Sequence, residues 1–287
     1  MPERPTNPYQ LGTTAFMACQ RDPRFPYCLH VPKGFDWTGE RPATLLVVVH
    51  GSRRMAQQGC APFEAFAEAH NVLILAPLFP MWSATPTETE GYKLLRAYGV
   101  GYDEVVLAMI EEAAKRYPIV TDRFLMHGFS GGGQFAHRFF FHHPERLRAV
   151  SIGAPGSVTL LDGMRPWPVG TKGIGRDGAG PDIAAMRRVP VLLLVGNRDT
   201  DTHEVTISRS SEHWHEGIND CGANRVEKIQ ALAASLRKYG VDATLNIVDD
   251  VAHEGLRVAP IAVEFFARAL EARGALEPGA TQKARTL

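Results

Sequence analysis

The sequence predicts one α/β domain, in which a mostly parallel, twisted sheet of about eight strands carries helices on both faces. Short continuous apolar runs, typical of strands buried on both faces, alternate with longer segments whose apolar residues recur at helical spacing. The 287 residues, 45% of them hydrophobic, suffice for a large core. Because no repeat or linker divides the chain, we expect residues 1–287 to form a single domain.

The predicted strands are short apolar segments bounded by turn residues. The first two are joined by a turn at Asp22-Pro23, and the others are buried runs. In chain order they are TTAFMAC (13–19), RFPYCLHV (24–31), ATLLVVVHG (43–51), NVLILAPLF (71–79), RFLMHGF (123–129), LRAVSIGAPG (147–156), VPVLLLVGNRD (189–199) and ATLNIVDD (243–250).

Helices are predicted between these strands. The clearest is YDEVVLAMIEEAAKRY (102–117), whose apolar residues share one face and which ends before Pro118. Gly240 is a stop signal for another helix, and Pro260 fits the first turn of the last one. The predicted helices cover 61–70, 102–117, the stretch from Ser130 to Pro144, 225–240 and 259–273.

Two segments interrupt this alternation and a third ends it. Residues 155–188 are rich in Gly and Pro and lie between two strands, so we expect a lid-like insertion that projects from the edge of the sheet. Residues 200–220 are polar, with several histidines and aromatic residues. The tail, 274–287, is expected to fray.

Charge and targeting signals narrow the class of protein. The net charge is +0 and no basic stripe is present, so nucleic acid is not an expected partner. No signal peptide and no apolar run long enough to cross a bilayer are evident, which predicts a cytoplasmic protein without a membrane partner. The four cysteines are scattered without a CxxC pair, so no zinc site is expected.

The segment FLMHGFSGGGQF (124–135) surrounds one serine with glycines. A serine hydroxyl is a weak nucleophile and must be held where both a base and a substrate can reach it. A tight turn between a strand and a helix does this, provided that the residues two positions away lack side chains. Gly128-Phe129-Ser130-Gly131-Gly132 fits this G-x-S-x-G pattern in the required strand–turn–helix context. The alternative is a flexible glycine turn without a catalytic role.

Over nearly its whole length the chain resembles an α/β-hydrolase, because its motifs follow the order of that superfamily. HG follows one buried strand, G-x-S-x-G the next but one, an acid a later strand, and a histidine the last strand. Within the superfamily, strand spacing and GFSGGG are similar to the compact esterases grouped with polyhydroxybutyrate depolymerases, feruloyl esterases and dienelactone hydrolases.

The resemblance implies a catalytic triad in the order Ser, acid, His. The acid follows VPVLLLVG, where GNRDTD offers Asp199 and Asp201. In similar proteins the acid lies three residues after the glycine, which favours Asp199; Glu204 is a further alternative. The base is expected between the last strand and the last helix, where His253 is the histidine present. It would take the proton of Ser130 and return it to the leaving group.

The resemblance also implies an oxyanion hole made of two backbone amides. One is the N–H of Gly131, directly after the nucleophile. The second lies in the loop after VVVHG, where similar esterases use the residue two positions after the histidine, here Ser52. Arg53 is the alternative donor, since the chain has HGSRR instead of the HGGG of some lipases. His50 is expected to hold this loop.

Three further residues are candidates for substrate binding. Arg53 and Arg54 stand beside the oxyanion loop, and one of them could bind an anionic group of the substrate, because Arg forms bidentate bonds to planar anions. The alternative is that both face solvent or pair with nearby acids. Trp167 in the insertion could line an acyl pocket.

Other histidines are not expected to be functional. His203, His213 and His215 lack the carboxylate spacing of a metal site, so no metal is predicted. A further set is expected on the surface: His137, His142 and His143.

The sequence therefore predicts a serine esterase that cleaves a small-molecule ester through an acyl-enzyme and needs no cofactor. The same triad could act on a peptide or amide, a lactone or a C–C bond, or depolymerise a polyester, because fold and triad are common to these reactions. A non-catalytic binding protein on the same scaffold is the remaining alternative. A homo-oligomer is left open.

Overall fold

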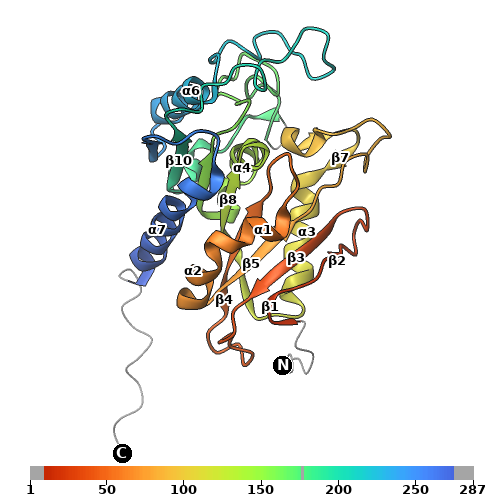
Figure 1. The fold of residues 1–287 in the computed structure, drawn as a ribbon, viewed down its shortest axis with the longest axis vertical. Coiled ribbons are helices and arrows are strands. Elements are labelled where there is room, and N and C mark those ends of the chain that lie inside the picture. Colours follow the sequence, from red (N-terminus) through yellow and green to blue (C-terminus); the bar gives the residue numbers. More distant parts are fainter. Residues whose placement is uncertain (1–9, 176–177, 275–287) are drawn as a thin grey trace, which may run out of the picture.

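The architecture is a single twisted sheet with helices on both faces, as predicted (Figure 1). It is seen in a computed structural model that describes residues 10–175 and 178–274. The sheet has nine strands in the order β1-β3-β5-β4-β8-β9-β10-β11, and β2 also pairs with β3. Strands β5, β4, β8, β9, β10 and β11 run parallel, whereas β3 is antiparallel to β5 and to β1 and β2.

The elements follow the predicted alternation. The strands are β1 (Gly12–Thr13), β2 (Met17–Ala18), β3 (Pro26–Val31), β4 (Ala43–Val49), β5 (Val72–Pro77), β6 (Arg96–Ala97), β7 (Val100–Gly101), β8 (Ile119–Phe129), β9 (Leu147–Gly153), β10 (Val191–Gly196) and β11 (Ala243–Val248). The helices are α1 (Ala56–Cys60), α2 (Glu64–His70), α3 (Tyr102–Ala114), α4 (Gly131–His142), α5 (Ile183–Met186), α6 (Arg225–Lys238) and α7 (Gly255–Gly274), with 3₁₀ turns η2 (Ala61–Phe63), η3 (Gly91–Leu94) and η4 (Pro144–Arg146).

The buried strands are apolar throughout because they serve two cores. Side chains alternate between the faces of a strand, so Leu45, Val47 and Val49 of β4 enter the core beneath α3, α4 and α6. Leu46 and Val48 enter the opposite core, to which α1, α2 and α7 contribute. This two-sided burial explains why the strands appear in the sequence as continuous apolar runs.

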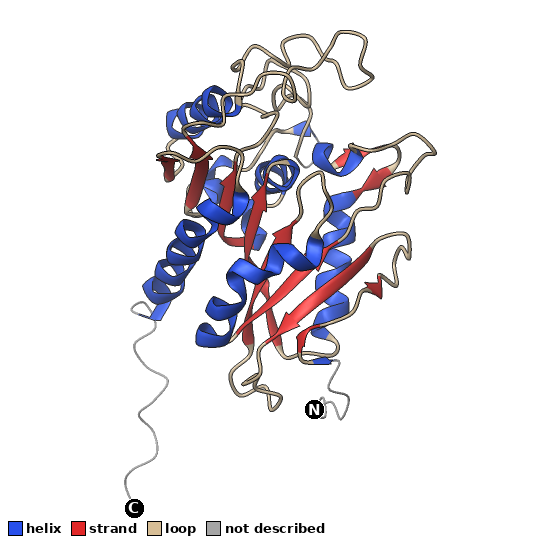
Figure 2. Cartoon of the chain, viewed as in Figure 1, coloured by secondary structure: helices blue, strands red, loops and turns tan. Residues whose placement is uncertain are grey.

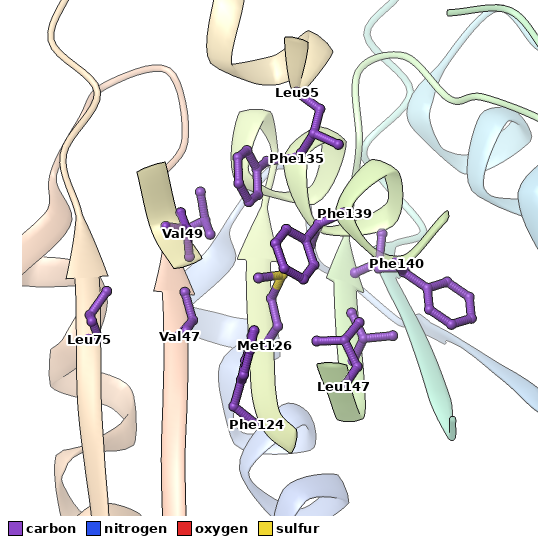
Figure 3. Packing of buried hydrophobic residues seen from close by; sticks show 14 of the residues in the cluster. Val47, Val49, Leu75, Leu95, Phe124, Met126, Phe135, Phe139, Phe140 and Leu147 are labelled. Carbon is purple, nitrogen blue, oxygen red and sulfur yellow. The ribbon is translucent and has the colours of Figure 1, made fainter. Parts of the chain in front are cut away.

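Helix α4 packs its aromatic residues directly against the centre of the sheet (Figure 3). Phe135 and Phe139, one turn apart, stack with their ring centroids 6.0 Å from each other. The Phe139 ring also lies 5.9 Å from that of Phe124 on β8. These contacts fix the helix that begins immediately after Ser130.

The direction of the strand order reverses between β4 and β8. From β4 the chain passes through α1 and α2 to β5 on one side, whereas from β8 it passes through α4 to β9 on the other side. The connections that leave the carboxyl ends of β4 and β8 therefore diverge, and ligands bind at such a point in open α/β sheets. Loops gather at the same end of the molecule (Figure 2).

The insertion 155–188 is anchored in the core at several points. Within its described part, Val158, Leu161 and Ile174 are buried in the core with α4 and α6, so this segment is packed structure for much of its length. Of the tail expected to fray, 274–287, only Gly274 is described, as the last residue of α7; residues 275–287 lie outside the described residues.

A buried carboxylate joins the hairpin β6–β7 and α3 to the end of α4. Asp103 accepts hydrogen bonds from His143 Nε2 at 2.8 Å and from Arg96 Nη2 at 2.7 Å. Burial by itself raises the pKa of Asp103, but these two donors outweigh it and lower the pKa from 3.8 to about 2.

Replacing Phe139 by Ala should lower the free energy of unfolding by about 3–5 kcal/mol, because it leaves a cavity under α4. Urea unfolding would measure the change. The matched control is Phe16→Ala, since Phe16 is 41% exposed and should lose less than about 1 kcal/mol. Equal losses for the two variants would contradict the packing described for α4.

Asp103 should make stability depend on pH in the acid range. Its pKa is depressed in the folded state, so its contribution is complete above about pH 4 and is lost as the pH falls toward about 2. We expect Asp103→Asn to be less stable than the wild type by about 2 kcal/mol at pH 6, with the gap narrowing toward pH 3. Urea unfolding at several pH values would test this, and a gap independent of pH would contradict it.

Candidate active site

Ser130 occupies a strained turn between β8 and α4. Its φ is 59° and its ψ is −118°, a region that residues with a side chain rarely adopt. The Ser130 N–H donates to Gly153 O at 2.8 Å, and its carbonyl accepts from Gln134 N at 3.0 Å. The turn is thus held by β9 on one side and by α4 on the other.

The glycines around Ser130 are required because backbone segments approach one another closely there. A Cβ on Gly128 would lie 2.1 Å from Gly132 O, and one on Gly132 would lie 2.1 Å from Val49 O. A Cβ on Gly133 would lie 2.3 Å from Gly153 O. Real Cβ atoms do not come so near to backbone oxygens, so these positions accept no other residue in this geometry.

Asp199 and His253 form a direct pair at the same edge of the sheet. His253 Nδ1 donates to Asp199 Oδ2 at 2.6 Å, and the Asp199 side chain is only 1% exposed. Asp201, the main alternative acid, is exposed and accepts a hydrogen bond from the backbone of His203 instead. With Nδ1 donating to Asp199, His253 Nε2 is free to accept a proton.

Two close contacts bring Asp199 and His253 together near the turn at Ser130. Gly196 at the end of β10 lies so close to the loop after β11 that a Cβ there would be 2.1 Å from Val251 O. The His253 ring lies 4.8 Å from the ring of Phe129, the residue directly before Ser130. A Cβ on Gly255 would lie 2.9 Å from that same ring, so a larger residue would displace it.

The loop after β4 reaches the nucleophile. A Cβ built on Gly51 would lie 3.5 Å from Ser130 Cβ, and one built on Gly131 would lie 3.3 Å from Ser52 N. The amides of Ser52 and Gly131 are therefore neighbours, and the Gly131 amide stands at the positive end of the α4 dipole.

His50 has a structural environment, as expected. Its Nε2 accepts from Phe79 N at 3.0 Å, so Nδ1 carries the proton and donates to Gly51 O at 2.8 Å. Burial lowers the pKa of His50 to about 4, which keeps the ring neutral. The residue holds the loop that presents Ser52.

The two arginines of this loop have different environments. Arg54 is committed to backbone carbonyls, since its guanidinium donates to Phe79 O at 3.0 Å, to Ser52 O at 2.6 Å and to Thr89 O. Each of its three nitrogens already donates to a backbone carbonyl, so the geometry does not favour the expected role in substrate binding. Arg53 is exposed and remains the candidate of the pair.

Trp167 lies away from the nucleophile, which corrects the expected pocket role. Its ring packs on His142 at 5.1 Å and beneath the Arg138 guanidinium at 5.8 Å. His142 is the last residue of α4, about 18 Å along the helix from Ser130 at 1.5 Å per residue. The expectation of a surface position for His137 is also wrong: its side chain is fully buried and its Nε2 accepts from Thr159 N at 3.0 Å.

The structure adds three residues that the sequence analysis missed. Tyr92 and Lys93 of η3 lie over Gly131, whose Cβ would meet Tyr92 Oη at 2.4 Å and Lys93 Cε at 2.9 Å. Burial lowers the pKa of the Lys93 ammonium, against the opposing effect of its partner Glu90. Arg225 contacts Asp199. Tyr92 and Lys93 could not be found from the sequence, because the residues of η3 show no periodic pattern. Arg225 could not be found either, because a buried arginine is not expected at the N-terminus of a helix.

The described residues contain neither a cluster of metal ligands nor a helix that could span a membrane. No three His, Cys, Asp or Glu side chains gather there into a group that could hold a metal ion. No described helix combines the length and apolar character needed to cross a bilayer.

The comparisons with known proteins bear on the fold. No family model and no curated protein matches the sequence. Among solved structures, poly(aspartic acid) hydrolase-1 from Sphingomonas sp. KT-1 superposes with a TM-score of 0.70 at 20% identity, over 88% of this chain and 97% of that one. The chain has the α/β-hydrolase fold.

Two further structures with this fold are similar. A poly(3-hydroxybutyrate) depolymerase from Bordetella parapertussis has a TM-score of 0.70 at 20% identity, covering 91% of this chain and 94% of its own. An S-formylglutathione hydrolase from Agrobacterium tumefaciens has a TM-score of 0.54 at 15% identity, covering 86% of this chain and 89% of its own. The resemblance to α/β-hydrolase esterases stated from the motifs is thus confirmed at the level of the fold.

Gly132→Ala should prevent correct folding of the nucleophile turn, because the new methyl would overlap Val49 O. We expect loss of most soluble protein, measured by expression yield and circular dichroism. Gly34→Ala is the control, since a Cβ there meets nothing within 4 Å. A folded, fully soluble Gly132→Ala protein would contradict the close approach of α4 and β4.

Proposed function

We propose that this chain is a serine hydrolase that cleaves carboxylic esters with a triad of Ser130, His253 and Asp199. The hydrogen-bonded pair of His253 and buried Asp199, with the His253 ring packed on Phe129 directly before the strained turn at Ser130, is the observation that carries the proposal. The similar folds of proteins named as hydrolases and a depolymerase also support it.

The proposed reaction uses the groups as follows. Ser130 Oγ attacks the ester carbonyl and gives its proton to His253 Nε2, while Asp199 stabilises the resulting imidazolium. The amides of Gly131 and Ser52 receive the oxyanion. When the C–O bond breaks, the proton passes to the departing alkoxide and leaves an acyl-Ser130. Water, deprotonated by His253, then attacks the acyl carbon; the bond from the acyl carbon to Ser130 Oγ breaks, and His253 returns the proton to Ser130 as the acid is released.

An ester is the first choice among the bonds that the proposed site could cleave. An amide, a lactone or a C–C bond could be cleaved by the same groups. A polymer substrate has specific support, since two proteins with this fold are named for hydrolysis of poly(aspartic acid) and depolymerisation of poly(3-hydroxybutyrate). Matched ester, anilide, lactone and polymer substrates would separate these reactions.

Ser130→Ala should lower kcat for p-nitrophenyl esters by about a thousandfold or more, because the nucleophile is lost. Hydrolysis of esters from acetate to octanoate would measure this and size the acyl pocket. Ser210→Ala is the control, since Ser210 is exposed and its hydroxyl pairs only with that of Ser208. Unchanged activity in Ser130→Ala would mean that Ser130 is only part of a glycine turn.

A non-catalytic binding protein would behave differently toward a serine-directed reagent. We expect a fluorophosphonate to add one phosphonyl group to the wild type and none to Ser130→Ala, read by intact mass. A folded wild type that is not labelled would favour the binding protein over the hydrolase.

A further inference from the structure

Arg225 is a buried cation in direct contact with Asp199. It is the first residue of α6, and its side chain is 6% exposed. One guanidinium nitrogen, Nη1, donates to Asp199 Oδ1 at 3.2 Å, while the other carboxylate oxygen, Oδ2, accepts from His253. The second nitrogen, Nη2, donates to Glu204 Oε2 at 3.0 Å. Asp199 is therefore clamped between a histidine and an arginine, and the arginine is shared with a second acid.

Local stability does not explain an arginine at this position. A cation in the first turn of a helix is opposed by the positive end of the helix dipole. The buried Nε of Arg225 has no hydrogen-bond partner, which carries a further cost. The contacts that offset these costs are the ion pairs with Asp199 and Glu204, and only the Asp199 pair is buried on both sides. The buried contact therefore places the role of Arg225 at the proposed triad.

Other charged groups near the pair are engaged elsewhere. Lys228, one turn along α6, donates its ammonium to Gly156 O and Val205 O. The other charged groups on the elements around Asp199 and His253 are Lys93 with Glu90, Glu254 with Arg257, Arg198 with Asp250, Asp249 with Asn197, Glu227 with Asn224, and exposed Asp201 and Arg53. Among the described residues, Arg225 is the cation that an ion pair joins to Asp199.

We propose that Arg225 is a positioning residue of the triad, which orients the Asp199 carboxylate toward His253 and, balanced by Glu204, sets the pH at which His253 accepts the proton of Ser130. This inference rests on the proposed function. Arg225 would fix one oxygen of Asp199 so that the other faces His253 Nδ1. The positive charge of Arg225 would also offset part of the negative charge of Asp199, which stabilises the imidazolium of His253.

The signs of two substitutions follow from this arrangement. Without the charge of Arg225, less positive charge opposes the imidazolium of His253, so the acidic limb of the pH–rate profile moves to higher pH. Without the negative charge of Glu204, the positive field of Arg225 at His253 is stronger, so the acidic limb of the pH–rate profile moves to lower pH. The second shift is smaller, because the Glu204 side chain is 64% exposed and screened by water and salt.

The experiment compares kcat/KM from pH 4.5 to 9 on one p-nitrophenyl ester. Arg225→Met should raise the midpoint of the acidic limb by about 1 pH unit and lower kcat about 10- to 100-fold with little change in KM. Arg225→Lys should recover part of the shift, since it restores the charge. Glu204→Gln should lower the midpoint by about 0.3 unit. Arg188→Met is the control, because Arg188 is exposed and donates only to Ala184 O.

The rate of fluorophosphonate labelling over the same pH range separates this inference from the proposed function. Labelling depends on Ser130 and its base but on no particular substrate, so it would serve even if the natural bond is not an ester. Opposite shifts for Arg225→Met and Glu204→Gln support the proposal. Glu204→Gln tests it even if Arg225→Met fails to fold, since Glu204 lies at the surface.

Two results would overturn the proposal in different ways. If the wild type is labelled and both variants keep its midpoint, Arg225 has only a structural role, and the proposed function stands. If the folded wild type is never labelled, the proposed function falls, and the role of Arg225 falls with it.

Discussion

The close approach of four backbone segments around Ser130 is the constraint on which the rest of the site depends. The carboxyl ends of β4, β8 and β9 and the first turn of α4 meet so tightly that Gly132 touches Val49 O and Gly133 touches Gly153 O. No side chain fits between them, so the turn at Ser130 adopts its strained φ of 59°. The aromatic packing of α4 on the sheet holds this arrangement, and the loops that carry Ser52, Asp199 and His253 converge on the same edge.

Buried cations cross-link the loop-rich end of the molecule, where regular hydrogen-bond ladders are few. Arg138 donates to Ser157, to Thr159 and to the carbonyl of Lys93, and so ties η3 to the segment after β9. Arg54 joins three backbone carbonyls in the same way. A multidentate donor can satisfy several loop carbonyls at once, whereas each carbonyl would otherwise need its own partner. Arg225 differs, because its partners are carboxylates, one of them in the proposed triad.

Several expectations from the sequence were wrong or incomplete for a common reason. Trp167 and Arg54 were linked to substrate by their neighbours in sequence, yet the fold turns one toward the end of α4 and the other toward backbone carbonyls. His137 was expected at the surface, but it lies on the face of α4 that the segment 157–159 covers. The Gly and Pro content of 155–188 hides in sequence the few apolar residues that anchor this insertion in the core.

The sequence by itself determined the sheet, its helices and the strand–turn–helix at Ser130, because these depend on local patterns: continuous apolar runs, helical spacing, and glycines two residues from a serine. It also narrowed the candidate acid to Asp199, Asp201 or Glu204. Only the tertiary structure decided which of them meets His253, since adjacent strand ends must be aligned in space before one side chain can reach across. The contact of Arg225 with Asp199, 26 residues apart in sequence, was decided in the same way.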